Sequence, residues 1–295
     1  MRRVLAVHFA PCALFVAGVC ALLRAGSFVG RSQWHAVPPQ GLSDALRLTV
    51  AVAVGSSLLG LLLQPFQVRA VRVLEGYWDR WPFTARLAEV LARVQRRRWR
   101  VLRKRALGTA GGDMADGVRA DAHRRLAVQP PGDRLLPTAL GNALRAGELS
   151  AGERYGLTTL TSWPRIYLQV SDRMAEALRS ARDALDTAVN LCWSFLALTV
   201  TSAAALYDEP SAWWLCGAGL LLAWVAYKGA VTVAQAYSGL MHLVYDLHRF
   251  DLLHALHLPL PPDREGEEEA FGEVSDMFEG VRRGYGTYDH GPTDS

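Results

Sequence analysis

The residues best placed for metal chemistry are histidines near the end of one helical stretch: His242, His248, His254 and His257, with Asp251 among them. Asp251, His254 and His257 follow one another at steps of three residues, so on a helix they span about 120° of its surface. A metal ion needs ligands that converge on one point, and further ligands would have to come from another segment. We therefore expect polar histidines at an interface here and no metal site.

No other pattern of nucleophiles, acids or thiols predicts a reaction. The four cysteines, Cys12, Cys20, Cys192 and Cys216, all lie in apolar runs and lack metal-ligand spacing. No serine or histidine stands in the context of a nucleophile elbow. The sequence thus predicts no catalytic residue, no cofactor and no metal, and hence a protein that is not an enzyme.

The strongest chemical signal is a basic run at the end of an amphipathic segment. Leu87, Val90, Leu91 and Val94 recur at helical spacing, which predicts a helix over residues 84–107. Seven of the ten residues from 96 to 105 are cations, with a tryptophan among them. Near a bilayer each such cation contributes about 1 kcal/mol of attraction to anionic headgroups. The candidate lipid-surface residues are Arg96, Arg97, Arg98, Trp99, Arg100, Arg103, Lys104 and Arg105.

Two other partners fit the same basic run. Arginines also contact the phosphates of nucleic acid, and Trp99 could stack on a base. No nucleic-acid-binding fold accompanies the run. Contacts with a protein are the second alternative. We favour anionic lipid headgroups, place protein contacts next and place nucleic acid last.

Four apolar runs predict the membrane-spanning helices that must position these residues. A hydrocarbon core needs about 20 mostly apolar residues per helix, and residues 4–23, 46–63, 188–206 and 212–234 supply such runs. The 64–187 segment carries 22 basic and 13 acidic side chains. Because cytoplasmic loops carry the excess of Lys and Arg, that segment and both termini are expected in the cytoplasm. The predicted fold class is all-α, an integral membrane protein with about four transmembrane helices and cytoplasmic helical extensions.

The stretch 172–206 alternates four- and three-residue steps between apolar or small residues. This heptad spacing predicts one helix of about 35 residues whose seam packs on a partner helix. The partner is either the fourth predicted span or a second copy of the chain. The candidate seam residues are Met174, Leu178, Ala181, Leu185, Cys192 and Phe195.

The remaining parts of the chain differ in composition. Tyr77, Trp78 and Trp81 follow the second predicted span, where aromatic rings typically anchor a chain among headgroups. The 237–295 segment carries 4 basic and 12 acidic side chains, so it either docks on the basic segment or is simply solvated. We divide the chain into transmembrane helices at 1–66, an interfacial segment and basic helix at 67–107, a flexible linker at 108–136, a helix and loop at 137–171, a long hairpin at 172–258 and an acidic, disordered tail at 259–295.

Several short motifs resemble those of an uncharacterised family of multi-spanning membrane proteins of bacteria, common in actinobacteria. They are Leu74-Glu75-Gly76-Tyr77-Trp78, Pro137-Thr138-x-Leu140-Gly141-Asn142-x-Leu144-Arg145-Ala146, Arg154-Tyr155-Gly156-Leu157, Trp163-Pro164-Arg165, Tyr245-Asp246-Leu247-His248-Arg249 and Leu258-Pro259-Leu260-Pro261. The likeness covers residues 60–262 approximately. It implies a membrane topology like the one predicted above and implies no reaction.

Two functions of different classes follow from these observations. The first is a non-enzymatic interaction or regulatory protein of the bacterial plasma membrane, whose cytoplasmic parts bind the lipid surface and a protein partner or a second copy of the chain. The alternative is a subunit of an oligomeric channel or transport system, with the heptad helix near a central axis.

Overall fold

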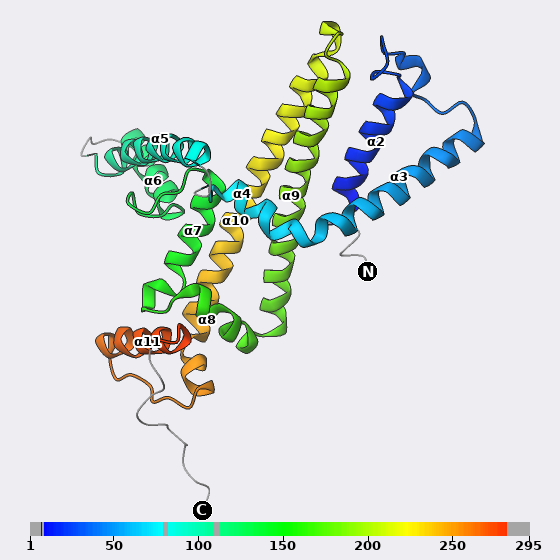
Figure 1. Cartoon of the computed structure of the whole chain (residues 1–295). Helices are drawn as coiled ribbons and strands as arrows, with labels where there is room; N and C mark the ends of the chain where they lie inside the picture. Colours follow the sequence, from blue (N-terminus) through cyan, green and yellow to red (C-terminus); the bar gives the residue numbers. More distant parts are fainter. Residues whose placement is uncertain (1–6, 8, 79–81, 109–112, 282–295) are drawn as a thin grey trace, which may run out of the picture. The chain divides into compact units, whose positions relative to one another are not determined.

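The computed structural model describes residues 7, 9–78, 82–108 and 113–281, and every regular element within these ranges is helical (Figure 1). The all-α prediction is therefore confirmed for the described residues. The chain divides into two compact units. We call Met1–Leu74 with Arg182–Val233 the apolar unit, and Glu75–Ala181 with Ala234–Ser295 the polar unit. Helices α9 (Asp172–Ala205) and α10 (Trp214–Ala255) contribute one end to each unit.

The first part of the apolar unit is a pair of helices, α2 (Ala10–Arg24) and α3 (Leu42–Leu63), which pack on each other. A short 3-10 helix, η2 (Trp34–Ala36), lies in their connection. Arg24 closes the pair through an ion pair of 2.7 Å with Asp44. Helix α3 passes through η3 (Gln64–Phe66) into α4 (Gln67–Glu75), so the chain stays helical from Leu42 to Glu75.

Three helical runs are long and apolar enough to cross a membrane: Leu42–Glu75, Asp172–Ala205 and Pro210–Ala255. They contain the second, third and fourth predicted spans. Helix α2 is also apolar but is shorter than these runs. The first predicted span, residues 4–23, begins outside the described residues, so its crossing of the membrane stays a prediction.

Helices α9 and α10 form the predicted hairpin. Helix α9 contains 34 residues, close to the expected length. The short connection between them ends in η6 (Pro210–Ala212). Within the apolar unit the two helices approach closely, because a side chain on Gly219 would collide with Thr199 Oγ1.

A hydrophobic core joins seven elements of the polar unit. It is built from α7 (Ala139–Ser150), η4 (Glu153–Tyr155), α8 (Thr159–Ile166), η5 (Tyr167–Gln169), the first turns of α9, the end of α10 and α11 (Arg264–Phe278). Its fully buried members include Leu157, Ile166, Val244, Tyr245, Leu253, Phe271 and Val274.

Two segments differ from the sequence expectation. The first is the expected linker at 108–136, which contains helix α6 (Asp113–Ala127). Helix α6 packs against α5 (Pro82–Ala106). Ala115, Ala122 and Leu126 lie on one side of α6 and are buried or half-buried. The two alanines allow a close approach to α5 that the low hydrophobicity of the segment does not predict.

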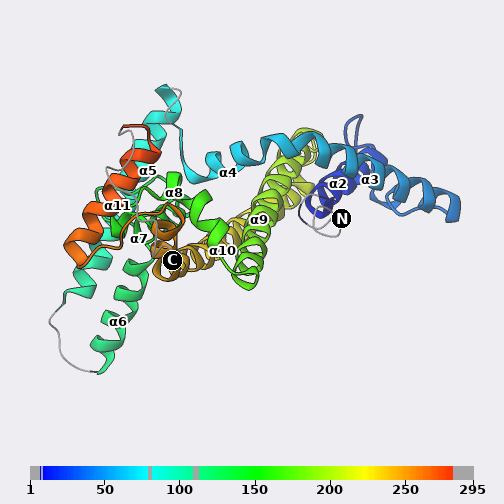
Figure 2. The same ribbon diagram turned by 90° about the horizontal axis from the view of Figure 1, so that it is seen from below.

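The second is the acidic tail, expected to be disordered from residue 259. Helix α11 begins at Asp263, whose side chain accepts a hydrogen bond from the Gly266 N–H at 2.8 Å, an N-cap. Phe271 and Val274 are fully buried in the core. The helix lies against α8 (Figures 1 and 2). The acidic segment is therefore folded over 264–278, and it docks on the basic segment, one of the two alternatives left open above.

The motifs that carry the family resemblance come together in the polar unit. Thr138 is the N-cap of α7: its Oγ1 accepts a hydrogen bond from the Gly141 N–H at 3.0 Å and donates one to the Glu75 carbonyl at 2.7 Å. Gly141 lies so close to that carbonyl that a Cβ would collide with it. The buried Asn142 side chain bonds both the N–H and the carbonyl of Leu136. These contacts fix the start of α7 against the end of α4.

A second set of motif residues meets around Tyr245, which is fully buried. Its hydroxyl lies 2.8 Å from Ser162 Oγ and donates to the Thr159 carbonyl at 3.3 Å. Trp163 stacks on the Tyr245 ring with centroids 6.1 Å apart. Tyr155 donates to Asp246, the next residue along α10. Helix α8 and η4 are thus fastened to α10 by aromatic packing and hydrogen bonds.

Candidate functional site

Helix α5 has two chemically different faces. One face carries buried or half-buried residues at steps of seven, seven and four residues: Ala88, Gln95, Leu102 and Ala106. It packs on α6, and Gln95 Nε2 donates to the Pro137 carbonyl at 3.5 Å. Because the chain beyond α5 folds back onto this face, a second face of the helix is left without a partner among the described residues.

The second face of α5, centred about 115° from the buried face, bears a stripe of large apolar side chains. Phe83, Leu87, Val90, Val94 and Val101 follow steps of four, three, four and seven residues, so they line one side of the helix. Each is between 42% and 83% exposed. We call these five residues the apolar stripe. Leu87, Val90 and Val94 were the residues that predicted an amphipathic helix, and the structure places them outward.

Cations border the apolar stripe on both sides. With about 100° of rotation per residue, Arg97, Arg98, Lys104 and Arg105 fall within about 70° of its centre, and Arg100 lies about 110° away. All five are exposed. An exposed apolar stripe between rows of basic side chains is the pattern of helices that lie in the plane of a membrane interface.

The other three predicted lipid-surface residues, Arg96, Trp99 and Arg103, lie more than about 140° from the centre of the stripe. The Trp99 ring is half-buried and faces another segment of the chain. A Cβ on Gly132 would lie 3.0 Å from two carbons of that ring. The Arg103 guanidinium stands over the ring, 5.2 Å from its centroid. The aromatic residue of the basic run thus packs on the 130–133 turn.

Beside the apolar stripe, a cavity of about 580 Å³ opens between α5 and that turn. It is lined by Arg93, Arg96, Arg97, Trp99, Arg100, Arg103, Gly132 and Asp133. We call it the arginine cavity. Sequence reasoning did not include Gly132 and Asp133, because the Pro-Pro-Gly-Asp turn carries no signal of what it packs against.

The seam residues of α9 lie in both units. In the polar unit Leu178 is buried, and Met174 and Ala181 are half-buried against the same core. In the apolar unit Leu185 and Cys192 are buried, and Phe195 is half-buried. Burial follows the heptad spacing at these positions. Val189 is also fully buried, although the strict spacing omits it.

The expected interfacial anchors are described in part. Tyr77 is 48% exposed and Trp78 is half-buried. The Trp78 carbonyl accepts a hydrogen bond of 2.6 Å from Thr84 Oγ1, which ties this segment to the first turn of α5. Trp81 lies outside the described residues.

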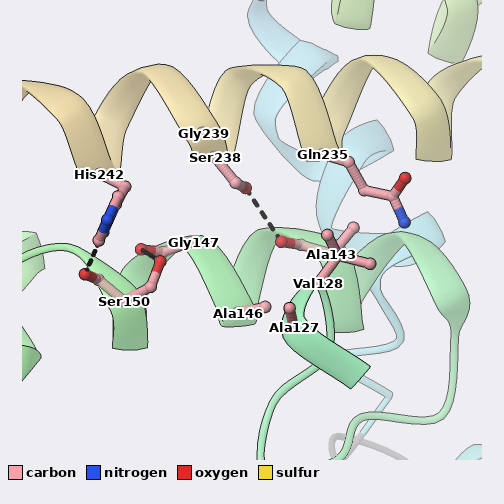
Figure 3. Close-up of a pocket in the computed structure, with 10 residues that line it drawn as sticks. All are labelled: Ala127, Val128, Ala143, Ala146, Gly147, Ser150, Gln235, Ser238, Gly239 and His242. Carbon is pink, nitrogen blue, oxygen red and sulfur yellow. Dashed lines mark hydrogen bonds between the residues drawn. The ribbon is translucent and has the colours of Figure 1, made fainter. Parts of the chain in front are cut away.

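A smaller cavity of about 250 Å³ lies between the end of α6, α7 and α10 (Figure 3). Its walls are mostly small residues, and a side chain on Gly147 would collide with Ser238. Ser238 donates to the Ala143 carbonyl at 3.0 Å, and His242 Nδ1 donates to the Ser150 carbonyl at 2.7 Å (Figure 3). The cavity therefore marks a close helix crossing that polar contacts hold in place.

Polar residues near that crossing form a network around Asp246. Its carboxylate lies 3.3 Å from His242 Nε2 and 3.6 Å from an Arg154 nitrogen, and it accepts a hydrogen bond from the Tyr155 hydroxyl. Burial, followed by the hydrogen bond to Asp246, raises the pKa of the Tyr155 phenol. Over the described residues, no group of three or more His, Cys, Asp or Glu side chains is arranged to hold a metal ion. The network therefore holds η4 on α10.

The apolar unit contains a third cavity, of about 360 Å³, lined largely by apolar side chains of α2, α3 and α9. Asn190 at its edge donates to the Val7 carbonyl at 3.1 Å, and Trp193 Nε1 donates to the Ala70 carbonyl at 3.2 Å. These bonds join α9 to the helices before it.

Comparison of the chain with protein-family models, with curated proteins and with solved structures finds no match. The family resemblance of the motifs therefore stays a prediction.

Proposed function

We propose that the chain is a non-enzymatic interaction protein of the bacterial plasma membrane, with both termini cytoplasmic, and that its polar unit docks on the anionic inner surface of the bilayer through α5. The observation that supports this most directly is the apolar stripe of α5, exposed between rows of cations. A protein partner or a second copy of the chain is the further ligand of the polar unit in this proposal.

The composition of the polar unit supports the topology. It combines Glu75–Ala181, which precedes α9, with Ala234–Ser295, which closes the hairpin. Two consecutive spans return a chain to the side from which it left, so both segments lie on one side of the membrane. The arginine excess of 64–187 then assigns that side to the cytoplasm.

The apolar stripe supplies the attraction that is independent of charge. Full burial of a Val, Leu or Phe side chain stabilises by about 1.5–3 kcal/mol. With roughly half of each stripe residue still exposed, insertion into the interface contributes about 1 kcal/mol for each, hence about 5 kcal/mol for the stripe. The bordering cations add about 1 kcal/mol each on an anionic surface. A neutral surface therefore binds α5 more weakly than an anionic surface.

Site-directed labelling of the full-length protein tests this proposal. In a background with all four cysteines replaced by serine, Val94→Cys places a label on the apolar stripe and Glu89→Cys places one about 140° away. The labelled proteins are reconstituted into nanodiscs of phosphatidylglycerol or of phosphatidylcholine. Accessibility of the label to dissolved oxygen and to a water-soluble nickel chelate then reports its environment.

We expect the Val94 label to prefer oxygen over the nickel chelate in phosphatidylglycerol nanodiscs, since it enters the interface, and to do so less in phosphatidylcholine. The Glu89 label should remain accessible to the chelate in both. Equal chelate accessibility at the two positions in phosphatidylglycerol would show that α5 does not lie on the membrane, and the proposed function would fail.

A further inference from the structure

We propose that the arginine cavity binds a phosphate group, carried either by a lipid headgroup or by a soluble phosphate compound. This inference deepens the proposed function, because it assigns a defined anion site to a helix otherwise proposed to attract anionic surface in general. The stripe and the cavity lie on different faces of α5, so each can be tested without the other.

The arrangement of arginines supports a site for one concentrated anion. Arg93, Arg96, Arg97, Arg100 and Arg103 line the same cavity, and they fall within about 140° of the helix surface. Guanidinium groups fit phosphate oxygens through paired N–H donors, which gives both strength and geometry. The cavity volume of about 580 Å³ lies in the range of about 300–1,000 Å³ typical of small-ligand sites.

The positive charge of the arginine cavity is poorly neutralised by the protein itself. Within the described parts of the chain, Arg96, Arg97 and Arg100 form no ion pair, and Arg93 has only an exposed contact of 3.9 Å with Glu89. Such a contact between exposed side chains is worth little. Asp133 is the one carboxylate in the lining. A bound phosphate would therefore meet a large excess of donors and a single repulsive charge.

Trp99 and Gly132 give the arginine cavity a fixed wall. The indole ring is held between the backbone of Gly132 and the guanidinium of Arg103. Stacking on the ring restrains Arg103, a side chain that otherwise loses considerable rotamer freedom when it binds. The wall therefore lowers the entropic cost of placing one of the donors around a ligand.

The decisive comparison is between arginines inside and outside the cavity. Arg96→Gln removes a lining residue, whereas Arg98→Gln makes the same change of charge on the outward face of α5, near the stripe. Asp133→Asn removes the repulsive carboxylate. Calorimetry of the full-length protein in detergent, with inorganic phosphate as the probe, measures the soluble form of the ligand. Native mass spectrometry from mixed micelles containing phosphatidic acid and phosphatidylcholine measures the lipid form.

We expect Arg96→Gln to weaken phosphate binding by at least about tenfold, since a hydrogen bond to a charged group is lost. Arg98→Gln should change it less than about twofold, and Asp133→Asn should strengthen it. Loss confined to inorganic phosphate identifies a soluble ligand, and loss confined to phosphatidic acid identifies a headgroup. Both results support the site.

Equal weakening by Arg96→Gln and Arg98→Gln would overturn the inference, because it would show a diffuse basic surface. The absence of any binding of phosphate or phosphatidic acid by the parent protein would do the same. Nucleic acid would contact all the cations of α5. Binding of an oligonucleotide that both variants weaken equally would therefore also count against the site. None of these results alters the expected depth of the Val94 label, so the two proposals fail separately.

Discussion

Replacement of Phe271 by alanine tests whether the acidic C-terminal segment is held to the polar unit as the structure describes. The Phe271 side chain is fully buried and its ring lies 6.1 Å from that of Phe250. Removal of a buried phenylalanine side chain costs about 3–5 kcal/mol, through lost burial and the cavity that remains. Val274 supplies the other fully buried side chain of α11, so this one change removes much of what holds the helix.

The loss should appear as local opening of α11, since a terminal helix can detach while the rest of the core stays closed. A cost of 3 kcal/mol or more corresponds to at least about a hundredfold increase in the open population. Hydrogen exchange of the full-length protein in detergent, read by mass spectrometry over residues 264–278, measures that population. Glu269→Ala, an exposed position on the same helix, should change the exchange less than about threefold.

Two results would refute the reasoning. If the parent protein already exchanges the α11 amides as fast as an unstructured peptide, the helix is not docked, and the sequence expectation of a disordered tail was correct. If Phe271→Ala and Glu269→Ala accelerate exchange equally, Phe271 does not hold the helix and the core of the polar unit is described wrongly.

Three further predictions follow from other parts of the molecule. Reporter fusions at Gly112 and at Ser295 should both give a cytoplasmic signal, and a periplasmic signal at Gly112 would contradict the topology. Leu178→Asp should prevent folding of the polar unit or lower its melting temperature strongly, since it buries a charge beside apolar side chains. Arg179→Asp, the control at an exposed position, should be tolerated in the same thermal assay. The pKa of Tyr155 is raised above the ordinary tyrosine value of about 10, so the neutral phenol stabilises the fold. This contribution is complete below about pH 10 and is lost as the pH rises through the pKa of the folded protein. Tyr155→Phe should therefore lose less stability than the parent protein between neutral and strongly alkaline pH, measured by thermal unfolding.

The helices that the sequence predicted well are those whose patterns are long. The length of α9 could be predicted because the heptad spacing of apolar residues continues over 172–206, and every turn of the helix shows it again. Threonine is a residue type favoured at helix N-caps, and Thr138 occupies that position at the start of α7. Local chemistry alone decides such features, so a single sequence suffices for them.

The two errors have a common physical cause, since both helices are stabilised by tertiary contacts that short segments do not reveal. Helix α6 contains Gly117 and few large apolar residues, and its packing on α5 depends on alanines. Helix α11 offers a weak but readable signal. Asp263 can act as an N-cap, Glu265 falls in the first turn, and Phe271 and Val274 lie on one face. Those two apolar residues looked too few to order an acidic segment, and only the core they enter makes them sufficient.

The sequence also does not show which face of α5 is buried, because the helix has two apolar faces. Leu87 and Val94 are larger than Ala88 and Ala106, so hydrophobicity alone favours burial of the large residues. The structure buries the alanines against α6 and exposes the large side chains. A water-soluble protein would gain by the reverse arrangement. The choice agrees with the proposed docking of α5 on a membrane, in a chain that has three helical runs long and apolar enough to cross one.

The distribution of satisfied and unsatisfied polar groups separates structural residues from candidate binding residues in the polar unit. The motif residues, such as Asn142 and Asp246, have their hydrogen-bonding groups engaged within the unit. Packing permits few other residues at these positions. Because their donors and acceptors are already engaged, these side chains have few groups left with which to bind a ligand. Arg96 and Arg100 are exposed and form no ion pair within the described residues. In the described residues the motif side chains thus hold the polar unit together, whereas the exposed arginines of α5 keep N–H donors that another molecule can bind.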